Sequence, residues 1–513
     1  METAEGWTTN RARELRERLS LLGRPFVAGE RLGVVLTVLF FFLAFLTYYL
    51  TRSSVFFTPP TSHFPFVPEQ TYFKGFVHAA DALLSGRLDI PNAADLRYLD
   101  WAFYKGKYYL VEPILPAVVL MPGVALWGVA LNQTLASVVI GGITASAVYR
   151  LMRGLTDKVS VQVWLTILFV FGTIYWWAAT DGSTSQFNQT LAVLFVFLAI
   201  HETLVAKRPF LAGVFLGAAH LCRLPIVLAF PFFVIMFADQ WLPESDEKSL
   251  IKRVNLIPLL KLCTGLGVFV ALGMVYNYLV FDTPLPSGMH YYKTDDPNDQ
   301  YAVKIAAGLF KAEYIPNHFP RIFSALPIFR SGAPYVLPSW AGMAFWATTP
   351  AFLYAFFAGV TNKLVIRSGL ALLAVAIALM FVINPVGRGL PIHVDFNPPF
   401  SLEYYPFALL VLLGLYVGFR NRLVLACWAA IIPIGLTHFT FGLTEGWPQF
   451  GYRFALDYYP FLFLLTWAAI GSKIKWHHMG LITLGIIVNL WGVVWIHQFQ
   501  AHGYLGLEWV AWG

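Results

Sequence analysis

Charged side chains are scarce in this sequence. Only 12% of its 513 residues are charged, whereas 58% are hydrophobic, and the mean hydropathy is +0.63. Soluble globular proteins have roughly 45–50% apolar and about 25% charged residues, so this composition excludes a soluble fold. The 17% of aromatic residues also excludes a disordered chain, which is poor in such side chains. The composition therefore predicts a polytopic membrane protein.

Cysteines and common catalytic motifs are scarce too. The three cysteines, Cys222, Cys263 and Cys427, lie in apolar stretches at spacings that fit neither a disulfide framework nor a zinc site. The sequence has no Walker phosphate loop and no GxGxxG, HExxH or GxSxG motif. The net charge is +7, and in a membrane protein such a surplus marks cytoplasmic loops. We therefore expect no nucleic-acid partner.

Long apolar runs separated by short basic loops make up most of the sequence. The run 32–50 follows the arginine-rich segment 1–31 and is long enough to cross roughly 30 Å of hydrocarbon, as a signal anchor does. All basic loops become cytoplasmic if 109–131 is re-entrant or interfacial and 209–241 forms two short helices that meet outside at Arg223. This predicts an all-α, multi-pass protein with about 13 transmembrane helices.

The predicted topology divides the chain into segments on the two sides of the plasma membrane. They are a basic cytoplasmic amino terminus (1–31), a first transmembrane helix (32–50), a first extracytoplasmic loop with interfacial and re-entrant segments (51–132), transmembrane helices (133–281), a large extracytoplasmic loop (282–336), C-terminal transmembrane helices (337–497) and an extracytoplasmic tail (498–513). The outer loops are the longer ones and carry most aromatics, carboxylates and histidines. We therefore expect the functional site at the extracytoplasmic face.

The first outer loop carries the candidate carboxylates. Glu69 begins a stretch with helical apolar spacing that reaches Leu84, which predicts an amphipathic helix lying on the membrane. The positive end of the helix dipole would keep Glu69 ionised, and the alternative is that Glu69 only caps the helix. Asp100 and Glu112 border two short aromatic strands with a turn at Gly106, and they could hold a polar ligand. The aromatic residues alone would be explained by an interfacial belt.

Two arginines at the outer ends of apolar segments are candidate anion ligands. A guanidinium at membrane depth is rare, and it binds either an anion or a carboxylate. Arg223 lies in the predicted hairpin, and Arg453 precedes a later span. The alternative for Arg453 is an intrahelical pair with Asp457, four residues on. Together the two arginines predict a phosphate site.

Polar residues in other outer loops could also bind substrate or metal. Asp181 begins a polar turn between two spans, with no basic residue in it. His290 and Tyr291 lie in the large loop, and His290 could bind a metal with His318 and His393 if the three converge. Core or hydrogen-bonding histidines are the alternative. We predict no metal site and no cofactor. A requirement for a divalent metal ion is the alternative.

The order of these motifs resembles that of the GT-C glycosyltransferases, especially protein O-mannosyltransferases and bacterial aminoarabinose transferases. The first part of the resemblance is an acidic residue that opens a helix closing at Gly86, followed by the proline-containing segment 108–116. The second part is the arginine-proline hairpin in 213–231. Two later segments, 276–284 and 451–457, resemble further elements of uncharacterised bacterial relatives. The matches span most of the chain after residue 68. Pro68 replaces the first acid of the usual Asp-Glu pair, and Glu112 replaces a Lys or His.

This resemblance implies an enzyme that transfers a sugar, with inversion, from a polyprenyl-phosphate carrier to an acceptor lipid, glycan or protein. It implies Glu69 as catalytic base, with Asp81 and Asp100 as alternatives, and Arg223 and Arg453 as ligands of the donor phosphate. The residues expected to contact substrate are Glu112, Asp181, Tyr109, His290, Tyr291 and Asp457. A transporter or lipid flippase is the competing function, although the sequence shows no obvious internal repeat. A catalytically inactive scaffold is the third possibility.

Overall fold

The computed structural model describes residues 28–52, 74–91, 93, 96, 100–243, 254–293, 300–329, 335–339, 342–383, 405–442 and 449–500. Two candidate residues, Glu69 and His393, lie outside these ranges. The described part of the chain is mostly helical, as the composition and the apolar runs predicted.

Seven helices among the described residues are long and apolar enough to cross a membrane. They are α2 (Ala28–Thr51), α5 (Gln133–Leu155), α8 (Thr184–Leu204), α13 (Ile257–Phe281), α17 (Lys363–Ile383), α19 (Arg422–Thr440) and α21 (Trp476–Val494). An eighth crossing is possible if α6 (Val159–Phe171) and α7 (Tyr175–Asp181), which are bent by 52°, form one broken span. The fold is thus that of a multi-pass membrane protein, but the predicted count of about 13 spans is not confirmed.

Prolines explain why several apolar runs form only short helices. These helices are α4 (Leu115–Trp127), α9 (Pro209–His220), η3 (Leu224–Ala229), α10 (Phe230–Met236), η6 (Pro350–Phe357), α18 (Tyr405–Gly418) and α20 (Tyr459–Ile470). Each has a proline at its first or second residue. Proline is favoured in the first turn of a helix but removes a hydrogen bond in its interior. These helices therefore begin at or next to a proline, and none of them reaches roughly 30 Å at about 1.5 Å per residue.

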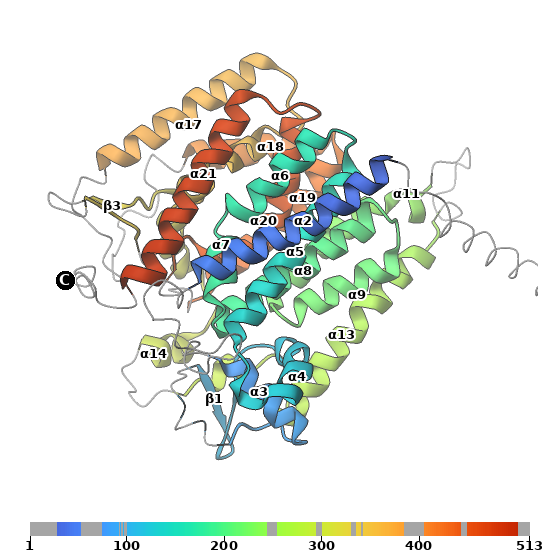
Figure 1. Cartoon of the computed structure of the whole chain (residues 1–513), viewed down its shortest axis with the longest axis vertical. Coiled ribbons are helices and arrows are strands. Elements are labelled where there is room, and N and C mark those ends of the chain that lie inside the picture. Colours follow the sequence, from blue (N-terminus) through green and yellow to red (C-terminus); the bar gives the residue numbers. More distant parts are fainter. Residues whose placement is uncertain are drawn as a thin grey trace, which may run out of the picture.

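The basic loops come together at one end of the helical bundle. The guanidinium of Arg153, in the last turn of α5, lies against Gly33 at the start of α2. Gly154 lies against Val205, just after α8, so α5 and α8 finish at this same end. The backbone of Lys207 accepts a hydrogen bond from α11 (Ala238–Trp241), which is also joined to Arg422 at the start of α19. We call this the basic end; Figure 1 shows α6 and α11 there.

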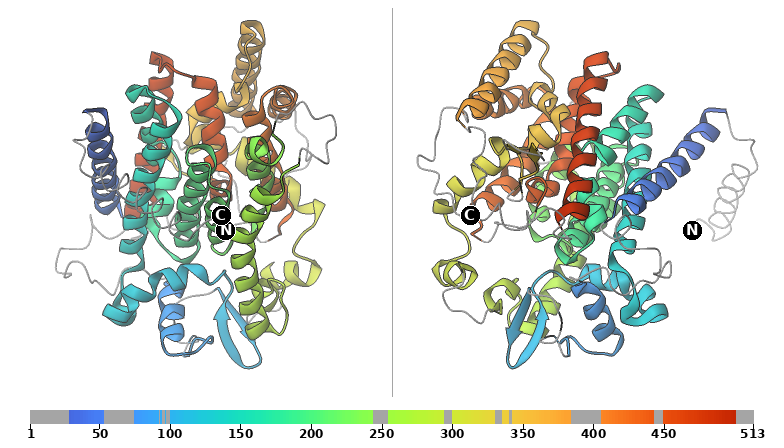
Figure 2. Two further views of the ribbon diagram at one scale, coloured as in Figure 1. Left: turned by 90° about the vertical axis from the view of Figure 1, so that its right-hand side faces the viewer. Right: turned by 60° about the vertical axis from the view of Figure 1, so that its left-hand side comes forward.

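The opposite end, which we call the loop end, is formed by α3 (Gly75–Leu84), α4, a β-hairpin and η4 (Gly288–Tyr291). Figure 2 shows α3, α4 and the hairpin gathered at this end. The hairpin pairs β1 (Trp101–Tyr104) with β2 (Lys107–Leu110), and its turn at Lys105 and Gly106 has positive φ at both residues. This is the turn geometry that fits the twist of paired strands, and it confirms the turn predicted at Gly106.

α3 forms the later part of the helix predicted in the first loop: it begins at Gly75, with Lys74 as its N-cap, and the predicted opening at Glu69 lies outside the described residues. α3 buries Phe76, Val77 and Ala80, and it is followed by Gly86 in a left-handed conformation with φ +69°. The remaining described elements are η2 (Gly128–Ala130), α14 (Gln300–Ala307), η5 (Ala312–Tyr314), α15 (Ile315–Phe323), the paired strands β3 (Ile328–Phe329) and β4 (Val336–Leu337), α16 (Phe345–Thr348), η8 (Arg453–Asp457) and the π-helix η9 (Trp495–Gln500).

Candidate functional site

Arg223 stands at the break between α9 and η3. Pro225 is the second residue of the 3-10 helix η3, where it cannot continue α9, and Arg223, the N-cap of η3, is extended, with φ −145° and ψ 103°. The imidazole of His220 closes the break through a 2.9 Å contact between Nδ1 and the carbonyl oxygen of Leu224. Because Arg223 is outside both helices, its guanidinium can reach across to η8.

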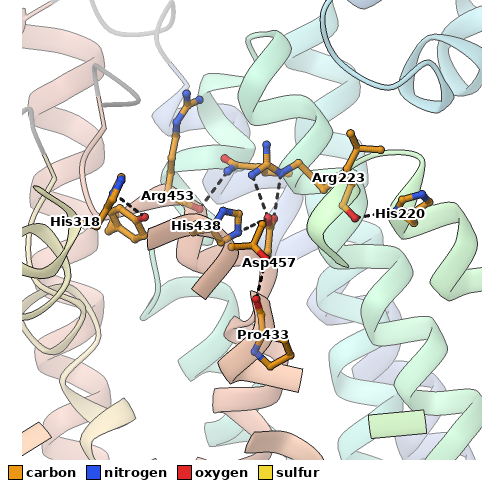
Figure 3. Close-up of polar contacts among 11 residues, drawn as sticks. His220, Arg223, His318, Pro433, His438, Arg453 and Asp457 are labelled. Atoms are coloured by element: carbon orange, nitrogen blue, oxygen red, sulfur yellow. Dashed lines mark hydrogen bonds and ion pairs between the residues drawn. The ribbon is translucent and has the colours of Figure 1, made fainter. Parts of the chain in front are cut away.

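Asp457, the last residue of η8, holds that guanidinium. The Nε and Nη2 groups of Arg223 donate to Oδ1 and Oδ2 of Asp457 at 3.2 and 3.0 Å (Figure 3). Nε2 of His438, on α19, lies 2.9 Å from the same Oδ2. Asp457 is only 1% exposed. Burial raises the pKa of this carboxyl, but the charge of Arg223 and the contact with His438 outweigh burial, so its pKa lies below the usual value.

The sequence left open an ion pair between Arg453 and Asp457. In the structure Asp457 pairs with Arg223 instead. The reason is the 3-10 winding of η8. In a 3-10 helix, residues three apart eclipse each other, so side chains four apart point in different directions. Figure 3 shows the side chain of Arg453 extending away from Asp457.

Arg453 and Arg223 nevertheless lie against the same aromatic ring. The guanidinium carbon of Arg453 is 5.1 Å from the ring centroid of Phe454, and that of Arg223 is 5.4 Å from it. The ring centroid of His438 is 5.4 Å from this ring as well. We call Arg223, Arg453, Phe454, His438 and Asp457 the arginine cluster. A cation–π contact leaves the charge of a guanidinium in place, but Asp457 compensates the charge of Arg223.

The backbone around Arg453 is fixed by two glutamines. The amide nitrogen of Arg453 donates to Oε1 of Gln449 at 3.0 Å, and its carbonyl accepts from Nε2 of Gln189 at 3.2 Å. Both glutamines are fully buried. Buried amides that bond the backbone restrict the position of the residue they hold. η8 therefore presents Arg453 from a fixed point at the loop end.

Asp100, directly before β1, is the carboxylate that the structure places near Arg453. Its Oδ1 accepts a 3.0 Å hydrogen bond from the hydroxyl of Tyr292, which pairs with Ala102 as an extra bridge beside the hairpin. Burial raises the pKa of Asp100, while the hydrogen bond from Tyr292 and the positive charge of Arg453 act to lower it. A carboxyl with a raised pKa and a nearby cation is typical of acid–base sites.

The other candidate carboxylates lie in different surroundings. Asp81 is exposed on α3, and Glu112 is half-buried between β2 and α4. Asp181 ends α7, where its Oδ1 accepts from the amide of Ser183 at 3.0 Å and its carbonyl accepts from Thr134 at 2.9 Å. These bonds clamp the turn before α8, so Asp181 has an evident structural role.

Tyr109, Tyr291 and His290 belong to the junction between the hairpin and α13. The rings of Tyr109 and Tyr291 lie 5.8 and 5.3 Å from that of Phe281. At the same junction Asp282 accepts from the hydroxyl of Tyr104 at 2.7 Å. His290 lies in η4. These contacts hold the hairpin on α13, and a substrate role for the three residues stays a prediction.

The histidines show no metal site within the described ranges. His318, on α15, contacts the hydroxyl of Tyr452 through Nδ1 at 3.2 Å and the carbonyl of Phe441 through Nε2 at 3.1 Å. Burial, together with the charge of Arg321, lowers its pKa to about 3. No group of three His, Cys, Asp or Glu in the described residues could hold a metal ion.

Sequence reasoning missed His438, Phe454 and Tyr292. His438 did carry a signal, since an ionisable residue inside an apolar, membrane-length helix is expensive and tends to be functional. Phe454 and Tyr292 carried none, because aromatic residues are abundant throughout this chain. Their roles depend on contacts between segments that are distant in the sequence.

Comparisons with known proteins return no match. No family model, no curated protein and no solved structure matches this chain. The resemblance to GT-C glycosyltransferases therefore stays a prediction from the motifs.

Proposed function

We propose that this protein is a GT-C-type glycosyltransferase, which moves a sugar from a polyprenyl-phosphate carrier to an acceptor lipid, glycan or protein at the extracytoplasmic face of the plasma membrane. The observation that carries the proposal is the arginine cluster. Two guanidiniums lie on one buried ring, and the charge of one of them acts on the half-buried carboxyl of Asp100. A phosphate ligand and a carboxylate base are the two groups that such a reaction requires.

The membrane supplies the rest of the donor's binding energy. A polyprenyl chain is apolar, and several large side chains on α2 and α13 are exposed, among them Val35, Phe42, Leu260 and Leu279. The proposal includes the topology in which the basic end is cytoplasmic. The short apolar helices α9, η3 with α10, η6, α18 and α20 then complete roughly 13 passes, shorter than usual.

In the proposed reaction, a carboxylate takes the proton of the acceptor hydroxyl as the oxygen attacks the anomeric carbon. The bond from that carbon to the phosphate oxygen breaks on the opposite face, so the configuration inverts. Arg223 and Arg453 would stabilise the charge on the departing phosphate. Glu69 is the base that the motifs favour, and Asp100 is the alternative base, because it is half-buried and the charge of Arg453 acts on it.

One feature favours transport as the second candidate function. The span formed by α6 and α7 is broken with a 52° bend, and discontinuous helices are typical of secondary transporters. The residues flanking the break, Phe171 and Tyr175, are buried aromatic side chains that carry no charge. A transporter would be expected to place an ion or substrate ligand there.

Consumption of donor distinguishes these functions. The purified protein, incubated with a radiolabelled polyprenyl-phosphate sugar and membrane lipids, should convert the donor into a labelled product. A transporter, a flippase or an inactive scaffold would leave the donor intact, and intact donor under conditions that retain folded protein would refute the proposal.

A further inference from the structure

The guanidinium of Arg153 lies against the backbone of α2 at the basic end. A Cβ atom on Gly33 would be only 2.5 Å from Nε and Nη1 of Arg153, so glycine is the residue that leaves room for this group. Gly33 is buried, whereas Arg153 is exposed. The guanidinium is thus held between α2 and α5 and stays accessible to a ligand. We call this place, formed by Gly33, Arg150 and Arg153, the seam.

Contacts below the seam fix the two helices relative to each other. The hydroxyl of Ser146, on α5, donates to the carbonyl oxygen of Thr37, on α2, at 2.8 Å. The ring of Tyr149, also on α5, stacks on that of Phe40 on α2, with the ring centroids 5.2 Å apart. Closely packed helices of this kind yield little. The space above Gly33 is therefore set by the packing of α2 on α5.

The arginines around the seam have no protein partner within the described part of the chain. Arg31, on α2, and Arg150 and Arg153, on α5, are exposed and form no hydrogen bond or ion pair with another described residue. Glu30, in the first turn of α2, forms no ion pair with them either. By contrast, Arg422 at the same end is paired with a carboxylate. The N–H groups of the three seam arginines are thus available to an anion.

Apolar side chains are exposed on both helices below the arginines. Ile143 lies seven residues, or about two turns, from Arg150 on the same face of α5, and it is exposed. Val35 and Leu39 are exposed on α2. Cations at the helix ends with apolar side chains below them match the two parts of a membrane lipid, a charged headgroup and its acyl chains.

We propose that the seam binds the headgroup of an anionic phospholipid. Arg150 and Arg153 donate to the phosphate oxygens, because guanidinium N–H groups pair with phosphate in a fork geometry. Arg31 adds attraction from α2, and the acyl chains lie along the exposed apolar side chains. Basic pockets between transmembrane helices hold such headgroups. The seam lies at the end of the bundle opposite the arginine cluster, so this inference does not depend on the proposed function.

Native mass spectrometry of the full chain tests the inference by counting bound lipids. The protein in detergent receives equal amounts of dioleoyl phosphatidylglycerol and dioleoyl phosphatidylcholine, which differ only in their headgroups. The wild-type protein should retain phosphatidylglycerol at least about tenfold better, since two basic residues beside an anionic headgroup have an effect of this size. Arg150→Gln with Arg153→Gln should reduce this preference to about twofold or less.

A second double variant is the matched control. Lys363→Gln with Arg367→Gln removes the same charge from exposed positions one turn apart on α17. α17 begins near the same end, because Gly359, shortly before it, lies against Asn421, the N-cap of α19. This variant should keep the wild-type preference. Equal losses in the two double variants would show a general attraction of the basic end for anions and would overturn the inference.

Gly33→Ala tests the seat of the guanidinium without changing any charge. The added Cβ atom would occupy the space of the Arg153 guanidinium, which must then move away. Alanine is a good helix former, so α2 should persist. The preference for phosphatidylglycerol should fall by about threefold, because one preorganised ligand is lost. An unchanged preference would mean that the glycine does not position Arg153 for a lipid, and the inference would fail.

Two outcomes with the wild-type protein are decisive even if a variant fails to fold. Equal retention of the two lipids would show that Arg153 only covers apolar surface and extends its head to water, and it would overturn the inference. Displacement of phosphatidylglycerol by inorganic phosphate would assign the seam to a soluble anion and overturn it as well. We expect no displacement, because inorganic phosphate lacks the acyl chains that hold a lipid beside α2 and α5.

Discussion

One ion pair at the basic end and one at the loop end differ strongly in burial. At the basic end Arg422 pairs with Asp239, and their side chains are 41% and 70% exposed. At the loop end Arg223 and Asp457 are 15% and 1% exposed. Exposed pairs contribute about 0–1 kcal/mol, whereas breaking a buried pair leaves an uncompensated charge that costs about 3–5 kcal/mol. Of these two pairs, the buried one therefore holds the larger electrostatic energy.

The sharpest test of this comparison is topological and gives an all-or-none result. Single cysteines at positions 207 and 223, in a background without the native cysteines, should react with impermeant thiol reagents from opposite sides of the membrane. Position 223 should react from outside, because only then are Lys207 and the other basic loops cytoplasmic. If both positions react from the same side, the two ends are not on opposite faces.

Chemistry at the loop end should show in turnover. Glu69→Gln keeps the size of the side chain but removes its basicity, so turnover should fall by roughly two to four orders of magnitude if it is the base, while donor binding persists. Asp100→Asn is the rival variant, and Asp239→Asn at the basic end is the matched control, expected to retain wild-type rates. Loss of turnover in Asp100→Asn with an active Glu69→Gln would assign the base to Asp100.

Stability should separate the two ion pairs. Asp457→Ala leaves the buried Arg223 without its carboxylate and should lower the free energy of unfolding by about 3–5 kcal/mol. Asp239→Ala removes an exposed partner and should change it by less than about 1 kcal/mol. Unfolding in detergent, followed by tryptophan fluorescence, measures both values. Equal losses in the two variants would contradict the distinction between the two ends.

The smallest expected effect is a pH dependence at His318. Burial lowers its pKa from 6.5 to about 3, so the unfolded chain binds a proton before the folded protein does. Its neutral form therefore contributes fully to stability above about pH 6.5, and this contribution is lost as the pH falls toward 3. Below pH 6 the slope should approach about 1.4 kcal/mol per pH unit.

His318→Gln is the control for that pH dependence. Glutamine retains a polar side chain but cannot bind a proton in this range, so the variant should lose stability less steeply between pH 6 and 4.5. The measurement is the shift of the unfolding midpoint with pH in both proteins. Parallel curves for wild type and variant would show that His318 does not titrate in this way.

Local features of the sequence predicted local structure well. The helical class followed from apolar runs, α3 from apolar spacing up to Leu84, and the hairpin turn from Gly106. The predicted count of about 13 spans is not confirmed, because prolines such as Pro225, Pro350 and Pro460 restart a helix inside runs that hydropathy alone treats as continuous.

The sequence by itself determined that this chain is a helical membrane protein, with its basic loops set apart from loops rich in polar and aromatic residues. Composition and periodicity suffice for this, because they act on each segment separately. Only the tertiary structure decided the partner of Asp457. The nearest arginine in sequence, Arg453, is turned away by the 3-10 winding of η8, and Arg223 arrives from a proline-broken hairpin 234 residues earlier. Such a pair forms because two backbones bring their side chains together in space, and no spacing within either segment encodes it.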